Sequence, residues 1–273
     1  MKTLLSILAS ASLLIQIGCG GSPTATSVVS ASNPSGSSTP PTTQGSSQYQ
    51  SWHFNAQSND APPRLLEALL AFSDSSITGV VRIALDTGVG TCINFEDVTP
   101  ISGSVDTNNA VHLTALSDAG YGPTLTIDAT LSADRSSMVS GKYQFTKSCG
   151  DGYGGTLTAT KVNPADGHYV GTLSQGNVNI PATADLTQAK IPDVGSGSFN
   201  VSATLIMTGP KCAGTYNLGG SVIGNYIVFG SNLSTGFEAL SGRIDPTGQQ
   251  LTLSDYPYSD DCTAGYQGIL QRQ

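Results

Sequence analysis

Three histidines are the side chains in this sequence that most often act as a general base or a metal ligand. They are His53, His112 and His168, and no His-x-x-x-His or His-Glu-x-x-His spacing links them. The cysteines that follow residue 50 also lack the paired spacing of a zinc site. Because His53 and His168 each precede an aromatic residue, and His112 alternates with apolar neighbours, we predict that all three pack on strands. The sequence therefore predicts no metal ion and no cofactor.

Other catalytic arrangements find equally little support. No Gly-x-Ser-x-Gly elbow is present for a serine nucleophile. A glycosidase needs two carboxylates that face each other across a cleft, whereas the neighbours Glu96 and Asp97 would point to opposite faces of an extended segment. We interpret this pair as part of a solvated loop and predict no catalytic residue.

An acidic segment near the end of the chain combines Asp255, Asp260 and Asp261 with Tyr256 and Tyr258. Oxygen ligands at this density could hold calcium, although the spacing of an EF-hand is absent. Tyrosines beside acids could also stack on a sugar or contact a protein. We expect the simpler outcome, which is a solvated loop.

The composition argues against a nucleic-acid partner and against a mostly helical fold. There are 11 Lys and Arg against 19 Asp and Glu, a net charge of −8. Nucleic acid is not an expected partner, because phosphate contacts need basic residues. Charged residues make up only 11% of the chain, which disfavours long exposed helices. The 32 glycines, together with many Ser, Thr and Asn residues, are typical of strands joined by tight turns.

Residues 1–18 have the composition of a signal peptide. Lys2 is followed by an apolar run from Leu4 to Ile17. As a helix this run would span about 21 Å, too short for a hydrocarbon core of about 30 Å. We therefore expect export rather than a membrane span.

The apolar run ends in Gln16-Ile17-Gly18-Cys19, which resembles the lipobox of bacterial lipoproteins. The resemblance implies that Cys19 carries a diacylglyceryl thioether and becomes the mature N-terminus, so that the membrane is a partner through the lipid. Gly20 after the cysteine implies the outer membrane, whereas Gln16 departs from the usual Leu. The alternative is an ordinary secreted protein with Cys19 left in its tail.

Lipid on Cys19 would also explain why the number of cysteines is odd. The remaining four are Cys92, Cys149, Cys212 and Cys262, an even number that suits an oxidising compartment. Residues 19–51 consist mostly of Gly, Ser, Thr, Pro, Ala, Asn and Gln, and they cannot bury enough apolar surface to fold. We expect a disordered tether with a reach of about 30 Å.

From residue 52 onward, apolar and polar residues alternate in two related halves. Three pairs of segments match in order: 52–54 with 167–169, 102–105 with 219–222, and 149–157 with 262–270. The last pair shares the pattern Cys-x-x-Gly-Tyr-x-Gly-x-Leu. The sequence therefore predicts a duplication, with repeat one at 52–161 and repeat two at 167–273.

We predict an all-β fold, an antiparallel meander with six or seven strands in each repeat. The strands could form one large barrel or sandwich, or two small tandem barrels. Because the link 161–167 is short and lacks linker composition, the sequence favours one continuous body. The run 65–72 contains strong helix formers, but its counterpart 180–186 has the pattern of a strand, so we predict a strand with a short helix as the alternative.

The duplication also constrains the cysteines and the repeated motif. Pairing equivalent cysteines within each repeat gives Cys92–Cys149 and Cys212–Cys262, and pairing across the repeats is the alternative. The motif is best explained by architecture, with the following roles: a turn conformation for Gly152 and Gly265, packing over the adjoining disulfides for Tyr153 and Tyr266, and core positions for Leu157 and Leu270.

Together these features resemble uncharacterised β-rich bacterial lipoproteins whose mature region duplicates a cysteine-containing unit. The resemblance covers residues 52–273 and supplies no activity. We predict a non-enzymatic lipoprotein, anchored to the bacterial cell envelope, that binds or scaffolds a protein or polysaccharide. The alternatives are a barrel that carries a small apolar ligand and a hydrolase of envelope or extracellular polymers.

Overall fold

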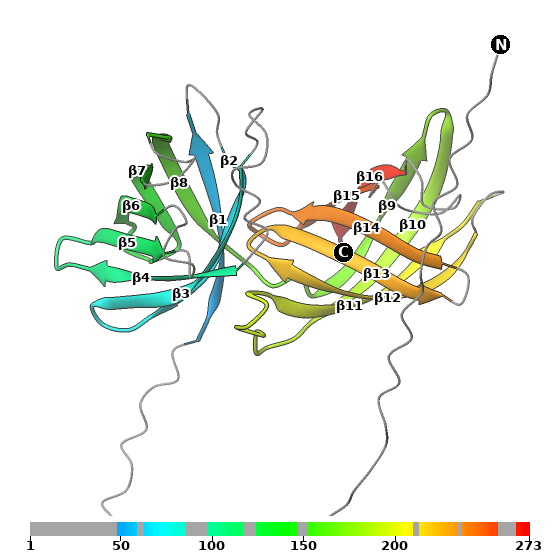
Figure 1. Cartoon of the computed structure of the whole chain (residues 1–273). Coiled ribbons are helices and arrows are strands. Elements are labelled where there is room, and N and C mark those ends of the chain that lie inside the picture. Colours follow the sequence, from blue (N-terminus) through cyan, green and yellow to red (C-terminus); the bar gives the residue numbers. More distant parts are fainter. Residues whose placement is uncertain are drawn as a thin grey trace, which may run out of the picture. The chain divides into compact units, whose positions relative to one another are not determined.

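The computed structural model describes residues 48–58, 63–85, 98–116, 124–146, 152–209, 213–233, 236–255 and 266–273. These residues form two closed antiparallel barrels of eight strands, one for each sequence repeat (Figure 1). The all-β prediction is confirmed, and so is the alternative of two small tandem barrels. The preferred arrangement, one large barrel or sandwich, is wrong.

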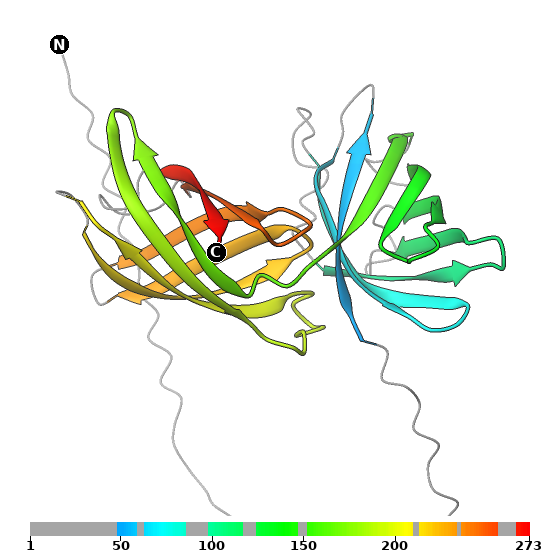
Figure 2. The ribbon, with the colours of Figure 1, turned by 180° about the vertical axis from the view of Figure 1, so that it is seen from behind.

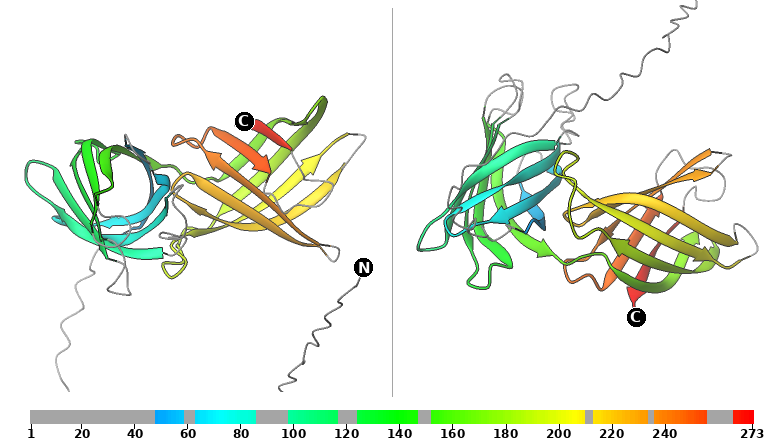
Figure 3. Two further views of the ribbon diagram at one scale, coloured as in Figure 1. Left: turned by 45° about the horizontal axis from the view of Figure 1, so that its top comes forward. Right: turned by 90° about the horizontal axis from the view of Figure 1, so that it is seen from below.

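Barrel one is an up-and-down meander. Its strands are β1 (Gln50–Gln57), β2 (Pro63–Phe72), β3 (Ser76–Leu85), β4 (Val98–Val105), β5 (Ala110–Leu116), β6 (Thr124–Leu131), β7 (Ser137–Thr146) and β8 (Gly154–Val162). Each strand pairs with the next, and β8 returns to pair with β1. Figure 3 (left) shows these strands as a closed ring.

Barrel two repeats this topology. Its strands are β9 (Gly167–Gln175), β10 (Val178–Gln188), β11 (Phe199–Met207), β12 (Gly214–Ile223), β13 (Tyr226–Leu233), β14 (Gly236–Ile244), β15 (Gln250–Asp255) and β16 (Gln267–Arg272). The ring closes where β16 pairs with β9, and Figure 2 shows β16, in red, beside the green β9. Eight strands exceed the six or seven expected, since glycine-rich strands such as β12 give a weak alternation signal.

The short link between the repeats misled the prediction of a single body. Barrel one is already closed when the chain leaves β8, so only a few residues are needed to reach β9. The link is itself packed: Ala165 is completely buried and donates its backbone N–H to the side chain of Gln188, and the Asn163 N–H bonds the carbonyl of Pro246. A packed link has no need of the flexible composition that separates independent domains.

Strand β2 confirms the prediction of a strand at 65–72 and explains its helix-like composition. Leu66, Ala68 and Leu70 belong to the core of barrel one. The alternate residues Glu67 and Leu69 point outward, yet both are completely buried, and Leu69 packs with residues of barrel two. Because both faces of β2 are covered, the alternation that marks a half-exposed strand is missing.

The predicted alternation around His112 is confirmed. In β5, Val111, Leu113 and Ala115 are buried in the core of barrel one, while the residues between them are exposed. Tight turns, which the composition predicted, join strands at 108–109, 133–134, 224–225 and 246–248. The described part of the chain contains no helix, and thus none that could cross a membrane.

The repeated motif has the architectural role that was predicted, as far as the structure describes it. Gly152 adopts a left-handed conformation with φ of 89°. Leu157 and Leu270 are buried in the cores of barrel one and barrel two, respectively. Tyr153 packs against the core of barrel one, and Tyr266 is buried in that of barrel two.

Candidate functional site

Several residues singled out from the sequence lie outside the described residues. They are Cys19, Cys92, Cys149, Cys212 and Cys262, the pair Glu96 and Asp97, Gly265, and the acidic segment from Tyr256 to Asp261. The lipid, the disulfides and the acidic loop therefore stay predictions. Within the described ranges, no three His, Cys, Asp or Glu side chains gather as metal ligands would.

The three histidines share a feature that the sequence did not predict, because each contacts a carboxylate on the neighbouring strand. Nδ1 of His168 lies 2.6 Å from Oδ1 of Asp185, between β9 and β10. Nδ1 of His112 likewise contacts Oδ1 of Asp128, between β5 and β6. All four of these side chains lie on outer faces and are about half exposed or more, so solvent screens both contacts.

The third histidine contact belongs to a polar cluster between the two barrels, which we call the Glu67 cluster. It consists of Glu67 and His53 from barrel one and Asn225 and Arg243 from barrel two. Nδ1 of His53 lies 2.8 Å from Glu67 Oε1, and the backbone N–H of Asn225 donates to Glu67 Oε2 at 3.2 Å. Nη1 of Arg243 donates to Glu67 Oε1 at 3.4 Å and to Asn225 Oδ1 at 2.6 Å.

Burial dominates the electrostatics of this cluster. The Glu67 side chain has no exposed surface, and this desolvation raises the pKa of its carboxyl group, although the contacts with His53, Asn225 and Arg243 oppose the rise. Arg82 occupies the position opposite Glu67 on β3. A buried carboxylate with partners from both barrels makes the orientation of barrel two depend on one side chain of barrel one.

A glycine allows the close approach that the cluster needs. Gly224, in the turn between β12 and β13, adopts φ of 54°, a conformation that favours glycine. A Cβ atom at this position would lie 1.7 Å from Glu67 Oε2 and 2.8 Å from the carbonyl oxygen of Trp52. The turn can therefore approach β1 and β2 only if residue 224 has no side chain.

The sequence contained one signal for this cluster. Glu67 is the single charged residue in the apolar run 65–72, and a lone acid among buried residues requires partners. The partners could not be identified from the sequence, because Asn225 and Arg243 are 158 and 176 residues away.

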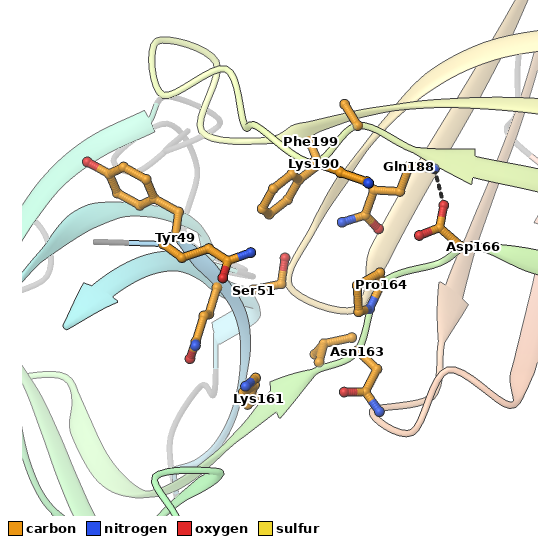
Figure 4. A pocket seen from close by; sticks show the side chains of 13 residues that line it. Tyr49, Ser51, Lys161, Asn163, Pro164, Asp166, Gln188, Lys190 and Phe199 are labelled. Atoms are coloured by element: carbon orange, nitrogen blue, oxygen red, sulfur yellow. Dashed lines mark hydrogen bonds between the residues drawn. The ribbon is translucent and has the colours of Figure 1, made fainter. Parts of the chain in front are cut away.

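A cavity of about 280 Å³ lies where the chain passes from barrel one to barrel two. Its lining residues come from the start of β1, the end of β8, the link, the end of β10 and the start of β11 (Figure 4). They are Gln48, Tyr49, Gln50, Ser51, Lys161, Val162, Asn163, Pro164, Asp166, Gln188, Ala189, Lys190 and Phe199. Nothing in the sequence marked this set, since its members are far apart along the chain.

Comparison with known proteins adds no assignment to this geometry. No family model, no curated protein and no solved structure matches the chain.

Proposed function

We propose that this chain is a non-enzymatic exported lipoprotein, held at the cell envelope by lipid on Cys19, whose two barrels present a binding or scaffolding surface. The observation that carries the proposal is the filled interior of both barrels. Among the side chains that the structure describes, those directed into each barrel are almost inaccessible to solvent. A partner would therefore bind on the outer surfaces or where the barrels meet.

The filled interiors favour this role over that of a carrier of small apolar ligands. A carrier encloses a cavity, and the side chains around such a cavity keep accessible surface. Here large side chains occupy the centres, including Trp52 and Phe145 in barrel one and Tyr169 and Tyr266 in barrel two, each with at most 1% of its surface accessible. These residues leave little room for a ligand beside them.

The positions of the histidines favour a binding role over a hydrolase. A hydrolase would place a histidine in a cleft together with acids and a nucleophile. His112 is instead 64% exposed on the outer face of β5, and its carboxylate partner Asp128 is equally exposed. A pair in this position is surrounded by water, which weakens its ability to hold a substrate.

The Glu67 cluster supports a scaffolding role. A scaffold must hold its parts in a defined arrangement. Hydrogen bonds to a buried carboxylate require a specific geometry, so the bonds from both barrels to Glu67 favour one arrangement of the two. Rotation of barrel two would break the hydrogen bonds that Asn225 and Arg243 donate to Glu67.

The topology is compatible with disulfides within each repeat, as also proposed. Cys92 and Cys149 follow β3 and β7, and Cys212 and Cys262 follow β11 and β15. All four strands are odd-numbered members of an up-and-down meander, so both cysteine-bearing connections of each barrel join strands at the same rim. A disulfide within a repeat does not have to join the two barrels.

Peptide mapping without reduction should recover Cys92–Cys149 and Cys212–Cys262, and a Cys92–Cys212 peptide would contradict the pairing.

The anchor and the binding role are tested separately. The full chain, expressed in a bacterial host with a palmitate analogue, should incorporate the label, and Cys19→Ala should not. Equal labelling of Cys19→Ala contradicts the anchor.

To test the binding role, the full chain is solubilised in detergent, where the lipid no longer attaches it to membranes. It should then sediment with isolated envelope polymers. Failure to sediment with any of them contradicts the binding role.

A further inference from the structure

The cavity described above contains two lysines whose charges are not neutralised within the described part of the chain. Figure 4 shows Lys161, from β8, and Lys190, which follows β10, on opposite sides of the cavity. Neither forms an ion pair with a described residue. In a protein with a net charge of −8, two such lysines around one cavity indicate a ligand that carries negative charge.

The acid of the cavity already has a structural partner. Oδ1 of Asp166 accepts the backbone N–H of Gln188 at 2.6 Å, which ties the link to β10. Its other carboxylate oxygen is available as an acceptor. Lys161, Lys190 and Asp166 together leave the cavity with one positive charge in excess, so an anionic group and a hydrogen-bond donor can both be accommodated.

Neutral polar groups extend the set of possible contacts. The carboxamide oxygen of Gln188 accepts the backbone N–H of Ala165 at 2.8 Å, so its NH₂ group remains as a donor. The carboxamide nitrogen of Asn163 donates to the carbonyl of Thr247, so its oxygen remains as an acceptor. The hydroxyl oxygen of Ser51, another residue of the cavity wall, has almost no accessible surface, so it is not among the groups that a ligand can reach.

Apolar side chains complete the lining. Tyr49, Val162, Pro164 and Phe199 contribute to the cavity, and Phe199 belongs to the core of barrel two. A ligand that fits this lining has an apolar face, several hydroxyl groups and one negative charge. The volume is close to the lower limit of typical ligand pockets, about 300 Å³, which suits a ligand of a single ring.

We propose that this cavity binds an acidic sugar, as one uronic acid residue of an envelope or extracellular polysaccharide. The carboxylate of the sugar pairs with Lys161 and Lys190, which are charge-assisted contacts. Its hydroxyl groups bond the Gln188 NH₂ group, the Asn163 oxygen and Asp166, and its C–H face packs on the apolar lining. Inorganic phosphate would leave the amides unused, and a neutral sugar would leave the lysines unpaired. The inference rests on the proposed binding role and does not depend on the lipid anchor.

Titration calorimetry on the detergent-solubilised full chain tests this site. The probes are a trisaccharide of galacturonic acid, the matching neutral trisaccharide of galactose, and inorganic phosphate. The uronate should bind at least tenfold more tightly than either of the others. Added salt should weaken this binding, because Lys161 is half-buried and Lys190 is exposed to solvent. Equal affinity for the neutral trisaccharide or for phosphate, or no uronate binding, overturns the proposal.

A matched set of variants locates the binding. The double variant Lys161→Gln, Lys190→Gln should lose at least tenfold in uronate affinity. The control Lys142→Gln removes an exposed lysine of β7 outside the cavity and should leave the affinity unchanged. Equal losses in the variant and the control would place the uronate elsewhere and overturn the site. A result against the Cys19 lipid would contradict the anchor only, whereas a failed titration would contradict the sugar site only.

Discussion

The first strand pair of each barrel carries the same kind of contact in opposite surroundings. In barrel one, His53 on β1 contacts Glu67 on β2, and the carboxylate is completely buried under the turn that contains Gly224. In barrel two, His168 on β9 contacts Asp185 on β10, and both side chains are about half exposed. The His53–Glu67 pair thus forms part of the contact between the barrels, whereas the equivalent His168–Asp185 pair stays in solvent. Loss of the buried carboxylate should lower the free energy of unfolding much more than loss of the exposed one. Exposed ion pairs contribute little to stability, whereas breaking a buried pair is strongly destabilising.

A second difference between equivalent positions concerns the ring that follows each histidine. Phe54 in barrel one is buried without a polar group, whereas Tyr169 in barrel two donates its hydroxyl to the carbonyl of Gly248 at 2.9 Å. Gly248 lies in the turn between β14 and β15, and the carbonyl of Pro246 in the same turn accepts the N–H of Asn163 in the link. Barrel two therefore uses its ring to hold the turn that supports the connection between the barrels.

The largest expected effect comes from the glycine that covers Glu67. Gly224→Ala places a Cβ atom 1.7 Å from the buried carboxylate and also strains a positive φ. We expect a loss of about 3–4 kcal/mol in the free energy of unfolding, measured by urea denaturation. The matched control is Gly176→Ala in the β9–β10 turn, where φ is 56° and nothing lies within 4 Å of the added atom. It should cost only about 1 kcal/mol, for backbone strain alone. Equal losses in the two variants would contradict the claim that the close approach to Glu67 requires a glycine at residue 224.

The next effect is the loss of the buried carboxylate itself. Glu67→Ala leaves Arg243 and the Asn225 N–H without their shared acceptor. We expect a loss of about 3 kcal/mol, whereas Asp185→Ala in the exposed pair of barrel two should change stability by no more than about 0.5 kcal/mol. Both are measured by urea denaturation under the same conditions. Equal losses in the free energy of unfolding would contradict the claim that the buried pair stabilises the protein more than the exposed pair.

A smaller effect is expected at the second pair of equivalent positions. Tyr169→Phe makes barrel two resemble barrel one at this position and removes the bond to Gly248. It should cost about 1 kcal/mol, because one buried carbonyl loses its partner. Thermal unfolding followed by circular dichroism measures the change. A variant as stable as the natural protein would show that the hydroxyl does not support the turn.

The smallest effect is a dependence on pH with opposite signs at two acids. Burial raises the pKa of Glu67, so between pH 7 and its ordinary pKa of 4.5 the folded state binds a proton more readily than the unfolded state. Acidification over this range should stabilise the natural protein relative to Glu67→Gln. Hydrogen bonds from Ser132 and Ser136 hold the pKa of the exposed Asp134 at about 2, so its contribution is present above pH 3.8 and is lost as the pH falls toward 2.

Urea denaturation of the natural protein, Glu67→Gln and Asp134→Asn between pH 7 and pH 2 separates the two signs. The advantage of the natural protein over Glu67→Gln should grow as the pH falls toward 4.5. Its advantage over Asp134→Asn should shrink below pH 3.8. A constant difference from Glu67→Gln across the range would contradict the effect of burial on that carboxyl.

The sequence predicted well those features that depend on neighbours along the chain. Local patterns predicted the alternation around His112, the tight turns between strands and the core positions of Leu157 and Leu270, and all were confirmed. The strand at 65–72 was also predicted, although only its counterpart in repeat two decided against a helix. The matching segments correctly indicated two related halves.

Features that depend on contacts between distant parts of the chain were missed. Closure of a barrel requires β1 to pair with β8, about a hundred residues later, and no local pattern reports such pairing. The link misled the prediction because Ala165 is packed and not because the barrels are one body. The Glu67 cluster and the cavity join segments from both repeats, so their chemistry becomes visible only when the chain is folded.

The closure of barrel one determines how the folded body would respond to a mechanical load. Strand β1 is the first strand after residue 48, and it pairs with β8 from Ser51 to Gln57 and with β2 on its other side. A pull applied through the preceding chain, along the strand, would shear these bonds together rather than peel them one after another. If the proposed lipid tether holds the chain at a membrane, the strand that receives its tension is β1. Because β1 is hydrogen-bonded along both edges, it should resist a steady pulling force.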